Sequence, residues 1–163
     1  MIELVVVLIV IGILAAFASA RFTGLRSDAA RSVVDGAAGA LRSMSALATA
    51  QARIDEVDNG TITAVGTSVP IIAGHAAAVW TGGIQHLLGI GTPDTEIAPT
   101  AECTTSNLCA AGAQTSLPGL GAVSGQAVLV WPRNYRATDQ CYAWYNNPGT
   151  GAAPAVGTRI TGC

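Results

Sequence analysis

The sequence contains no lysine, and all eight of its basic residues are arginines. Charged residues make up 11% of the 163 residues, against about 25% in ordinary soluble domains, whereas 50% of the residues are hydrophobic. This balance excludes an intrinsically disordered protein, which combines low hydrophobicity with high net charge. The net charge of −2 argues against a nucleic-acid-binding protein, because such proteins concentrate positive charge on one face. We therefore expect no nucleic-acid partner.

Residue patterns that support catalysis or metal binding are also scarce. Only His75 and His86 could supply an imidazole base, and the sequence lacks the nucleophile-elbow, zinc-protease and phosphate-loop motifs. The four cysteines include no Cys-x-x-Cys pair of the kind that favours zinc. We expect no enzymatic activity, no cofactor and no metal, and a membrane-anchored enzyme is the weakest of the functions considered.

Proline is absent before Pro70, and Glu3 is the only charged residue among the first 20. Every residue from Leu4 to Ala18 is apolar or glycine. Twenty helical residues span about 30 Å, which is roughly the thickness of the bilayer hydrocarbon core. The run therefore predicts a membrane-spanning helix. A cleavable signal peptide fits poorly, because Glu3 stands where such a peptide has basic residues.

The charges and cysteines around this run suggest opposite orientations. Arg21 and Arg26 follow the run and would place the C-terminal part in the cytoplasm. Four cysteines in a short chain instead suggest disulfides and an oxidising compartment. Both observations hold if a basic leader preceded Met1 and was removed. We therefore expect a processed or truncated chain whose C-terminal part lies outside the cytoplasm.

Helical periodicity continues after the apolar run and ends at Ile54, before the turn signal Asp58-Asn59-Gly60. The predicted buried stripe of this second half consists of Phe22, Leu25, Ala29, Val33, Ala37, Ala40, Met44 and Leu47. The sequence thus predicts one helix of about 50 residues, which is too long for a compact domain of this size. Its first half must therefore contact lipid or other copies of the chain.

The rest of the chain is rich in Gly, Thr, Ala and Pro, and it contains short β-type runs between turns. Residues 126–131, 140–145 and 155–161 predict strands. Residues 69–72 predict an edge strand, because Pro70 lacks a backbone donor. A short helix is expected within residues 80–90.

These patterns predict an α+β fold in which an antiparallel sheet packs on the second half of the long helix. Residues 1–21 form the hydrophobic segment for a membrane or filament core. Residues 22–54 are the amphipathic continuation of the helix. Residues 55–163 form a globular, β-rich head.

The N-terminal sequence Met1-Ile-Glu-Leu-Val-Val-Val-Leu-Ile-Val-Ile-Gly-Ile-Leu-Ala-Ala resembles the start of a mature type IV pilin. That family begins with Phe-Thr-Leu-Ile-Glu-Leu, followed by a long apolar run and a glycine in the register of Gly12. A Cys-Tyr strand at Cys141-Tyr142 and the terminal Thr161-Gly162-Cys163 resemble the mannose-sensitive haemagglutinin (MSHA) branch of type IVa major pilins. The first two mature residues of the family, including its N-methylated phenylalanine, are missing from this sequence.

The resemblance implies the type IV pilin fold, with a long N-terminal helix packed on a sheet, and a structural function. Such a chain is the major subunit of a type IV pilus, which polymerises helically through its N-terminal helix. The filament supports surface attachment and biofilm formation, with motility as a further expected role. The implied partners are other copies of the chain, a prepilin peptidase/methyltransferase, an assembly ATPase, an inner-membrane platform and a secretin. The implied locations are the inner membrane for the single-pass precursor and the cell surface for the filament.

The resemblance also implies roles in subunit assembly for Glu3 and Gly12. The matching glutamate of the family meets the terminal amine of a neighbouring subunit and guides insertion into the filament. Family filaments commonly loosen the helix between the matching glycine and a proline. Ala20 stands here where many relatives have that proline, so the resemblance does not decide whether the helix loosens near Gly12.

Four cysteines allow three disulfide pairings. Sequential pairing joins Cys103 to Cys109 in a small loop and Cys141 to Cys163 in a larger one. The second pair resembles the C-terminal disulfide loop of type IVa pilins. The first pair is expected mainly because its two cysteines are close in sequence.

Two alternative functions share the same N-terminal helix. A type II secretion pseudopilin forms a short periplasmic piston, whereas a minor pilin binds DNA or a receptor at a filament tip. Abundance in shed filaments would distinguish a major subunit from a minor one.

Overall fold

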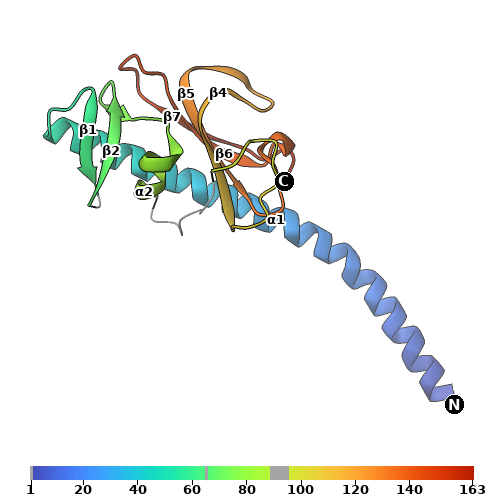
Figure 1. Ribbon diagram of the computed structural model, residues 1–163. Helices are drawn as coiled ribbons and strands as arrows, with labels where there is room; N and C mark the ends of the chain where they lie inside the picture. The colour runs from blue at the N-terminus through green and yellow to red at the C-terminus, as the bar shows by residue number, and fades with distance from the viewer. Residues whose placement is uncertain (1, 65, 89–95) are drawn as a thin grey trace.

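The computed structural model describes residues 2–64, 66–88 and 96–163, except for the side chains of residues 18–23. Helix α1 (Ile2–Ile54) is continuous, and its 53 residues extend about 80 Å. Its first half projects from a head that the rest of the chain builds around its second half (Figure 1). The predicted single long helix that ends at Ile54 is confirmed.

A three-stranded antiparallel sheet covers the C-terminal end of α1. Its strands β1 (Gly60–Ala64), β2 (Thr67–Ile72) and β3 (His75–Ala76) lie in the order β1-β2-β3. Because β2 is the central strand, the prediction of an edge strand at Pro70 is wrong. The Pro70 carbonyl accepts a hydrogen bond from the Ala77 N–H at 2.9 Å, on the same side as its ring nitrogen. The missing donor therefore falls on the side of the very short strand β3.

The predicted helix within residues 80–90 is confirmed only in part. Residues Gln85–Leu87 form the short helix α2, whereas Trp80–Ile84 (η1) is an irregular turn in which Gly82 has a φ of 72°. Glycine adopts this left-handed conformation without the steric cost that a Cβ atom would add. The last two residues of the predicted range lie outside the described part of the chain.

A four-stranded antiparallel sheet forms the larger part of the head. Its strands β4 (Leu108–Leu117), β5 (Gly121–Pro132), β6 (Tyr142–Asn147) and β7 (Ala155–Arg159) pair in sequence order. The three strands predicted in this region are confirmed as β5, β6 and β7. Strand β4 was not predicted, because its Ala-Ala-Gly-Ala centre shows neither β-branched residues nor apolar alternation.

The second half of α1 forms the core together with one face of the larger sheet. Its buried residues are Ala30, Val34, Ala37, Ala38, Leu41, Met44, Ala48 and Ala52. The predicted buried stripe is therefore confirmed at Ala37 and Met44 but wrong at three large residues, since Leu25 is 61% exposed, Val33 42% and Leu47 70%. Two apolar stripes run along this half at different angles, and hydrophobicity alone does not tell which one the sheet covers. Phe22 lies outside the described side chains.

Two polar side chains of β6 join the two sheets. The Tyr145 hydroxyl donates a hydrogen bond to the Ala76 carbonyl at 2.7 Å. The buried Asn147 amide donates to the carbonyls of Ile72 at 3.1 Å and Ala76 at 3.0 Å. Its oxygen accepts from the Gly149 N–H at 2.8 Å. These bonds satisfy buried backbone carbonyls and fix both sheets on α1 as one head.

Candidate assembly surface

The first half of α1 has no polar face. Its twelve large apolar side chains are between 50% and 81% exposed, because no other part of the described chain packs on them. They are Ile2, Leu4, Val5, Val6, Val7, Leu8, Ile9, Val10, Ile11, Ile13, Leu14 and Phe17. Covering about half of each would release on the order of 10 kcal/mol, as much as the whole stability of a typical domain. A helix that is apolar all round needs partners outside its own chain.

The apolar segment predicted at residues 1–21 is only partly described. Met1 and the side chains of residues 18–21 lie outside the described part of the chain. Over the residues that are described, no helix combines the length and the apolar character needed to cross a membrane.

Glu3 and Gly12 both lie on the projecting half of α1, and the structure does not bring them together. Glu3 is exposed in the first helical turn, where a carboxylate interacts favourably with the helix dipole. Gly12 lies nine residues further on, about 14 Å along the axis. Glu3 is thus the one charged group on an otherwise apolar surface.

Four glycines of α1 are not packed against any side chain or strand of the described residues. A Cβ atom added at Gly12, Gly24, Gly36 or Gly39 would meet no atom within 4 Å. Each glycine costs about 1 kcal/mol of helix stability relative to alanine. Small residues let a second helix approach closely. Packing within the described part of the chain therefore does not explain these glycines.

The second half of α1 carries a further uncovered surface, here called the exposed stripe. It consists of Leu25, Ala29, Val33, Gly36, Leu47 and Ile54, which are all exposed and share one helix face. Their successive spacings of 4, 4, 3, 11 and 7 keep them on one side of the helix, as in helix pairing. The sequence analysis placed four of these residues, Leu25, Ala29, Val33 and Leu47, in the stripe that faces the head, and the structure leaves them exposed.

Two disulfides lie in the head. Cys103 is bonded to Cys109 near the start of β4, and Cys141 is bonded to Cys163 at the C-terminus. The structure therefore contains the two sequential pairs that were predicted. Within the described residues, no group of three or more His, Cys, Asp and Glu side chains could hold a metal ion.

An open cavity of about 680 Å³ lies beside the second half of α1, lined in part by Arg42, Arg53 and His75. The His75 Nδ1 atom lies 2.9 Å from the Thr49 hydroxyl. Partial burial, and then the nearby Arg53 charge, lower the pKa of His75 below its usual value of 6.5. The neutral imidazole is therefore favoured at physiological pH.

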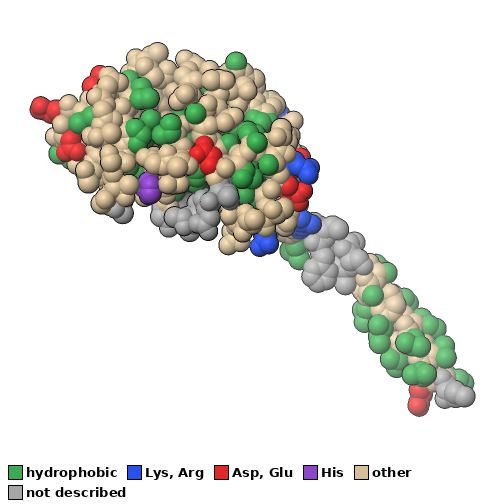
Figure 2. Space-filling view, viewed as in Figure 1, with side chains coloured by type: hydrophobic (Ala, Val, Ile, Leu, Met, Phe, Trp, Pro, Cys, Tyr) green, Lys and Arg blue, Asp and Glu red, His purple; other side chains and the backbone are tan. Residues whose placement is uncertain are grey.

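Charge is unevenly distributed between the two ends of the head. Figure 2 shows acidic side chains at the tip farthest from the projecting helix, and arginines together with some acidic side chains where the helix leaves the head. The largest aromatic side chains do not add to this surface, because Trp80, Trp131, Tyr142 and Tyr145 are fully buried. The exposed features of the described chain are thus apolar helix faces and charged ends.

Comparisons with protein families, with characterised proteins and with solved structures found no match to this chain. The N-terminal sequence motif and the geometry of α1 are therefore the observations on which a function can be proposed. Both concern the same part of the molecule, the projecting helix.

Proposed function

We propose that this chain is the major structural subunit of a type IV pilus, of the MSHA-like type IVa class. The observation that carries the proposal is the projecting half of α1, which is apolar all round except for Glu3. Copies of such a helix bury this surface by packing against one another, and the head stays outside the bundle. The filament would serve attachment to surfaces and biofilm formation, with motility as a further role.

The exposed glycines and the exposed stripe of α1 support the same proposal. They provide positions where neighbouring helices approach closely, beyond the apolar first half. A head held by two disulfides is suited to a filament exposed outside the cell, where thiols are oxidised.

We also propose that the chain is held in the inner membrane before assembly. A prepilin peptidase/methyltransferase, an assembly ATPase, an inner-membrane platform and a secretin are the partners that such a subunit needs. The same apolar residues would face lipid in the precursor and other copies in the filament, so assembly exchanges one apolar environment for another.

Glu3 is proposed to select and position the incoming subunit. A carboxylate inside an apolar helix bundle costs a few kcal/mol unless a partner compensates its charge. In the proposed filament, that partner is the terminal amine of a neighbouring subunit. The substitution Glu3→Val is therefore expected to leave membrane insertion intact and to abolish filament formation or lower it sharply.

The test uses electron microscopy of filaments sheared from cells, with mass spectrometry to identify their subunit. Long filaments built mainly of this chain in the wild type, and few or none with Glu3→Val, are expected. Membrane fractionation of both variants controls for insertion. Normal filaments from Glu3→Val would refute the role of Glu3. A wild-type chain that stays in the inner membrane and periplasm without filaments would instead favour a type II secretion pseudopilin.

A further inference from the structure

A second open cavity, of about 530 Å³, lies where α1 enters the head. Its walls come from α1, from the start of β4 and from the end of β5. Val33, Leu108 and Pro132, here called the apolar floor, contribute apolar surface to its lining, and Arg26 and Arg133 line it as well. The cavity, here called the base cavity, thus combines an apolar surface with two cationic side chains.

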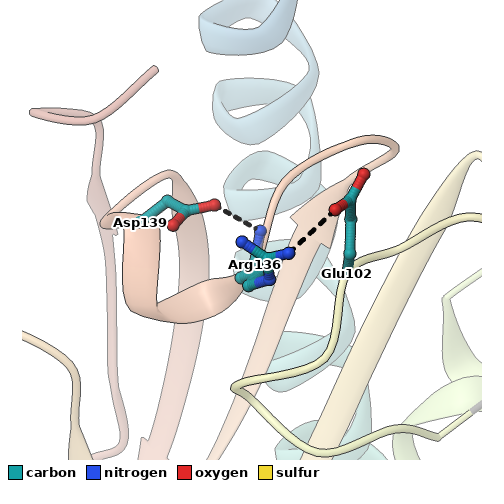
Figure 3. Close-up of polar contacts among 3 residues, drawn as sticks. All are labelled: Glu102, Arg136 and Asp139. Atoms are coloured by element: carbon teal, nitrogen blue, oxygen red, sulfur yellow. Dashed lines mark hydrogen bonds and ion pairs between the residues drawn. The ribbon is translucent and has the colours of Figure 1, made fainter.

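The two arginines of the base cavity have no acidic partner within the described part of the chain. The ion pair among the described residues lies outside the cavity lining and joins Arg136 to Glu102, with a nitrogen-to-oxygen distance of 3.0 Å (Figure 3). The Arg136 backbone N–H also donates to Asp139, so this neighbouring arginine is held in its own loop. The residues that line the base cavity include no Asp or Glu. Arg26 and Arg133 are therefore available to anionic groups from outside.

The opposite end of the head has the complementary chemistry. Ile54, the last residue of α1, is 74% exposed, and the exposed carboxylates of Asp55 and Glu56 follow it. Glu56 has a left-handed φ of 54°, and the Val57 N–H donates to the Ala52 carbonyl at 2.8 Å. Residues 54–56, here called the acidic knob, are thus held in a defined turn.

The position of these carboxylates is not explained by folding. The C-terminal end of a helix carries partial negative charge, which disfavours nearby Asp and Glu. Asp55 accepts hydrogen bonds from the Gln51 amide at 3.0 Å, and no cation pairs with it among the described residues. A positively charged partner from outside the chain would compensate this unfavourable arrangement.

We propose that the acidic knob of one copy docks into the base cavity of the next copy in the filament. Ile54 would cover the apolar floor, and Asp55 and Glu56 would face Arg26 and Arg133. This docking rests on the proposed polymerisation through α1. Because the two surfaces differ and lie at opposite ends of the head, the contact is head-to-tail, and with an axial displacement between copies it propagates into an open helical polymer.

The length of α1 fixes the geometry of this contact. Residues 26 and 54 are 28 residues apart, which corresponds to about 42 Å along the helix. A copy displaced by this distance brings its residues 2–17 to the level of residues 30–45 of the copy below. The second half of α1 in one copy and the apolar first half of the next copy would therefore lie at the same level along the filament.

Charge reversal in the full-length chain tests the docking. Arg26→Glu combined with Arg133→Glu, or Asp55→Arg combined with Glu56→Arg, is expected to lower the yield of sheared filaments about tenfold. The four substitutions together restore opposite charges and should recover most of that yield. Arg42→Glu, an exposed arginine of α1 outside the base cavity, is the matched control and should change the yield less than about twofold. Equal loss with this control, or no recovery in the combined variant, would overturn the docking.

Cysteine cross-linking in filaments provides a second measurement that does not depend on yield. Ile54→Cys combined with Asn134→Cys should give a ladder of covalent multimers under oxidation, because each copy would bond to two others. Ile54→Cys combined with Leu120→Cys, which lies outside the base cavity, should give no ladder. If the wild type forms filaments but Ile54→Cys combined with Asn134→Cys gives no ladder, the docking alone is refuted. A wild-type chain without filaments would refute the proposed function instead.

Discussion

The two halves of α1 form one continuous helix but differ in what covers them. Within residues 30–52, eight side chains are buried against the sheets. Within residues 2–17, the apolar side chains are exposed on every side of the helix. The second half therefore contributes to the stability of the head, whereas the first half can contribute only through a partner. The two halves are equally helical, so the exposure of their side chains distinguishes the second half, which stabilises the head, from the first half, which is proposed to act in assembly.

The largest expected effect is on the free energy of unfolding, when leucine is replaced by alanine in each half of α1. Leu41 is fully buried, so Leu41→Ala should lower the free energy of unfolding of the head by about 2–5 kcal/mol. Leu8 is 60% exposed, so Leu8→Ala should change it by less than about 0.5 kcal/mol. Urea unfolding of the detergent-solubilised chain, followed through the near-UV signal of the buried tryptophans, measures both values.

Leu47→Ala provides the control within the second half. Leu47 is 70% exposed although it lies only six residues from Leu41. It should therefore behave like Leu8 in the unfolding experiment, with a change below about 0.5 kcal/mol. A loss as large as that of Leu41→Ala would show that the head also covers the exposed stripe, and the comparison between the halves would fail.

Removal of the disulfides should affect the head and leave the first half of α1 unchanged. In the chain-entropy description, replacing Cys141 and Cys163 by serine costs about 3 kcal/mol, because their loop spans 22 positions. The same change at Cys103 and Cys109, which are six positions apart, costs about 2 kcal/mol. Thermal unfolding of each double variant under oxidising conditions measures the order. A larger loss for the shorter loop would contradict this explanation.

The sequence was sufficient to predict the elements whose patterns are strong. The continuous periodicity that ends at Ile54 predicted the whole of α1, and β-branched or aromatic runs predicted β5, β6 and β7. Strand β4 was not predicted, because small residues with weak strand preference fill its centre. Its pairing with β5 makes this segment a strand. The edge position predicted for Pro70 was wrong because a central strand tolerates proline where the missing donor faces a very short neighbour. The sequence does not show that β3 is this short neighbour.

The candidate assembly surface was predictable in its first half but not in its second. A long apolar run needs a partner whatever the fold of the rest of the chain. The sequence alone therefore predicted that residues 2–17 form a surface for contact with lipid or other copies. Which face of residues 24–54 the head covers depends on how the sheets pack, and the prediction chose Val33 and Leu47 where the structure buries Val34 and Leu41. The base cavity depends on Pro132 and Arg133 lying beside α1, a contact between residues about 100 positions apart that no local pattern encodes.

The smallest expected effect concerns the pH dependence of the head near His75. Burial and Arg53 lower the pKa of His75 in the folded chain, so the unfolded chain binds a proton more readily. Stability should therefore be independent of this group above its ordinary pKa of 6.5 and fall as the pH drops below that value. His75→Gln should flatten the stability profile as the pH falls below 6.5, because glutamine does not titrate there but can still bond to Thr49. His86→Gln, at an exposed residue that contacts the neighbouring Gln85, is the matched control. If His86→Gln flattened the profile and His75→Gln did not, His75 would not be the group that couples pH to folding.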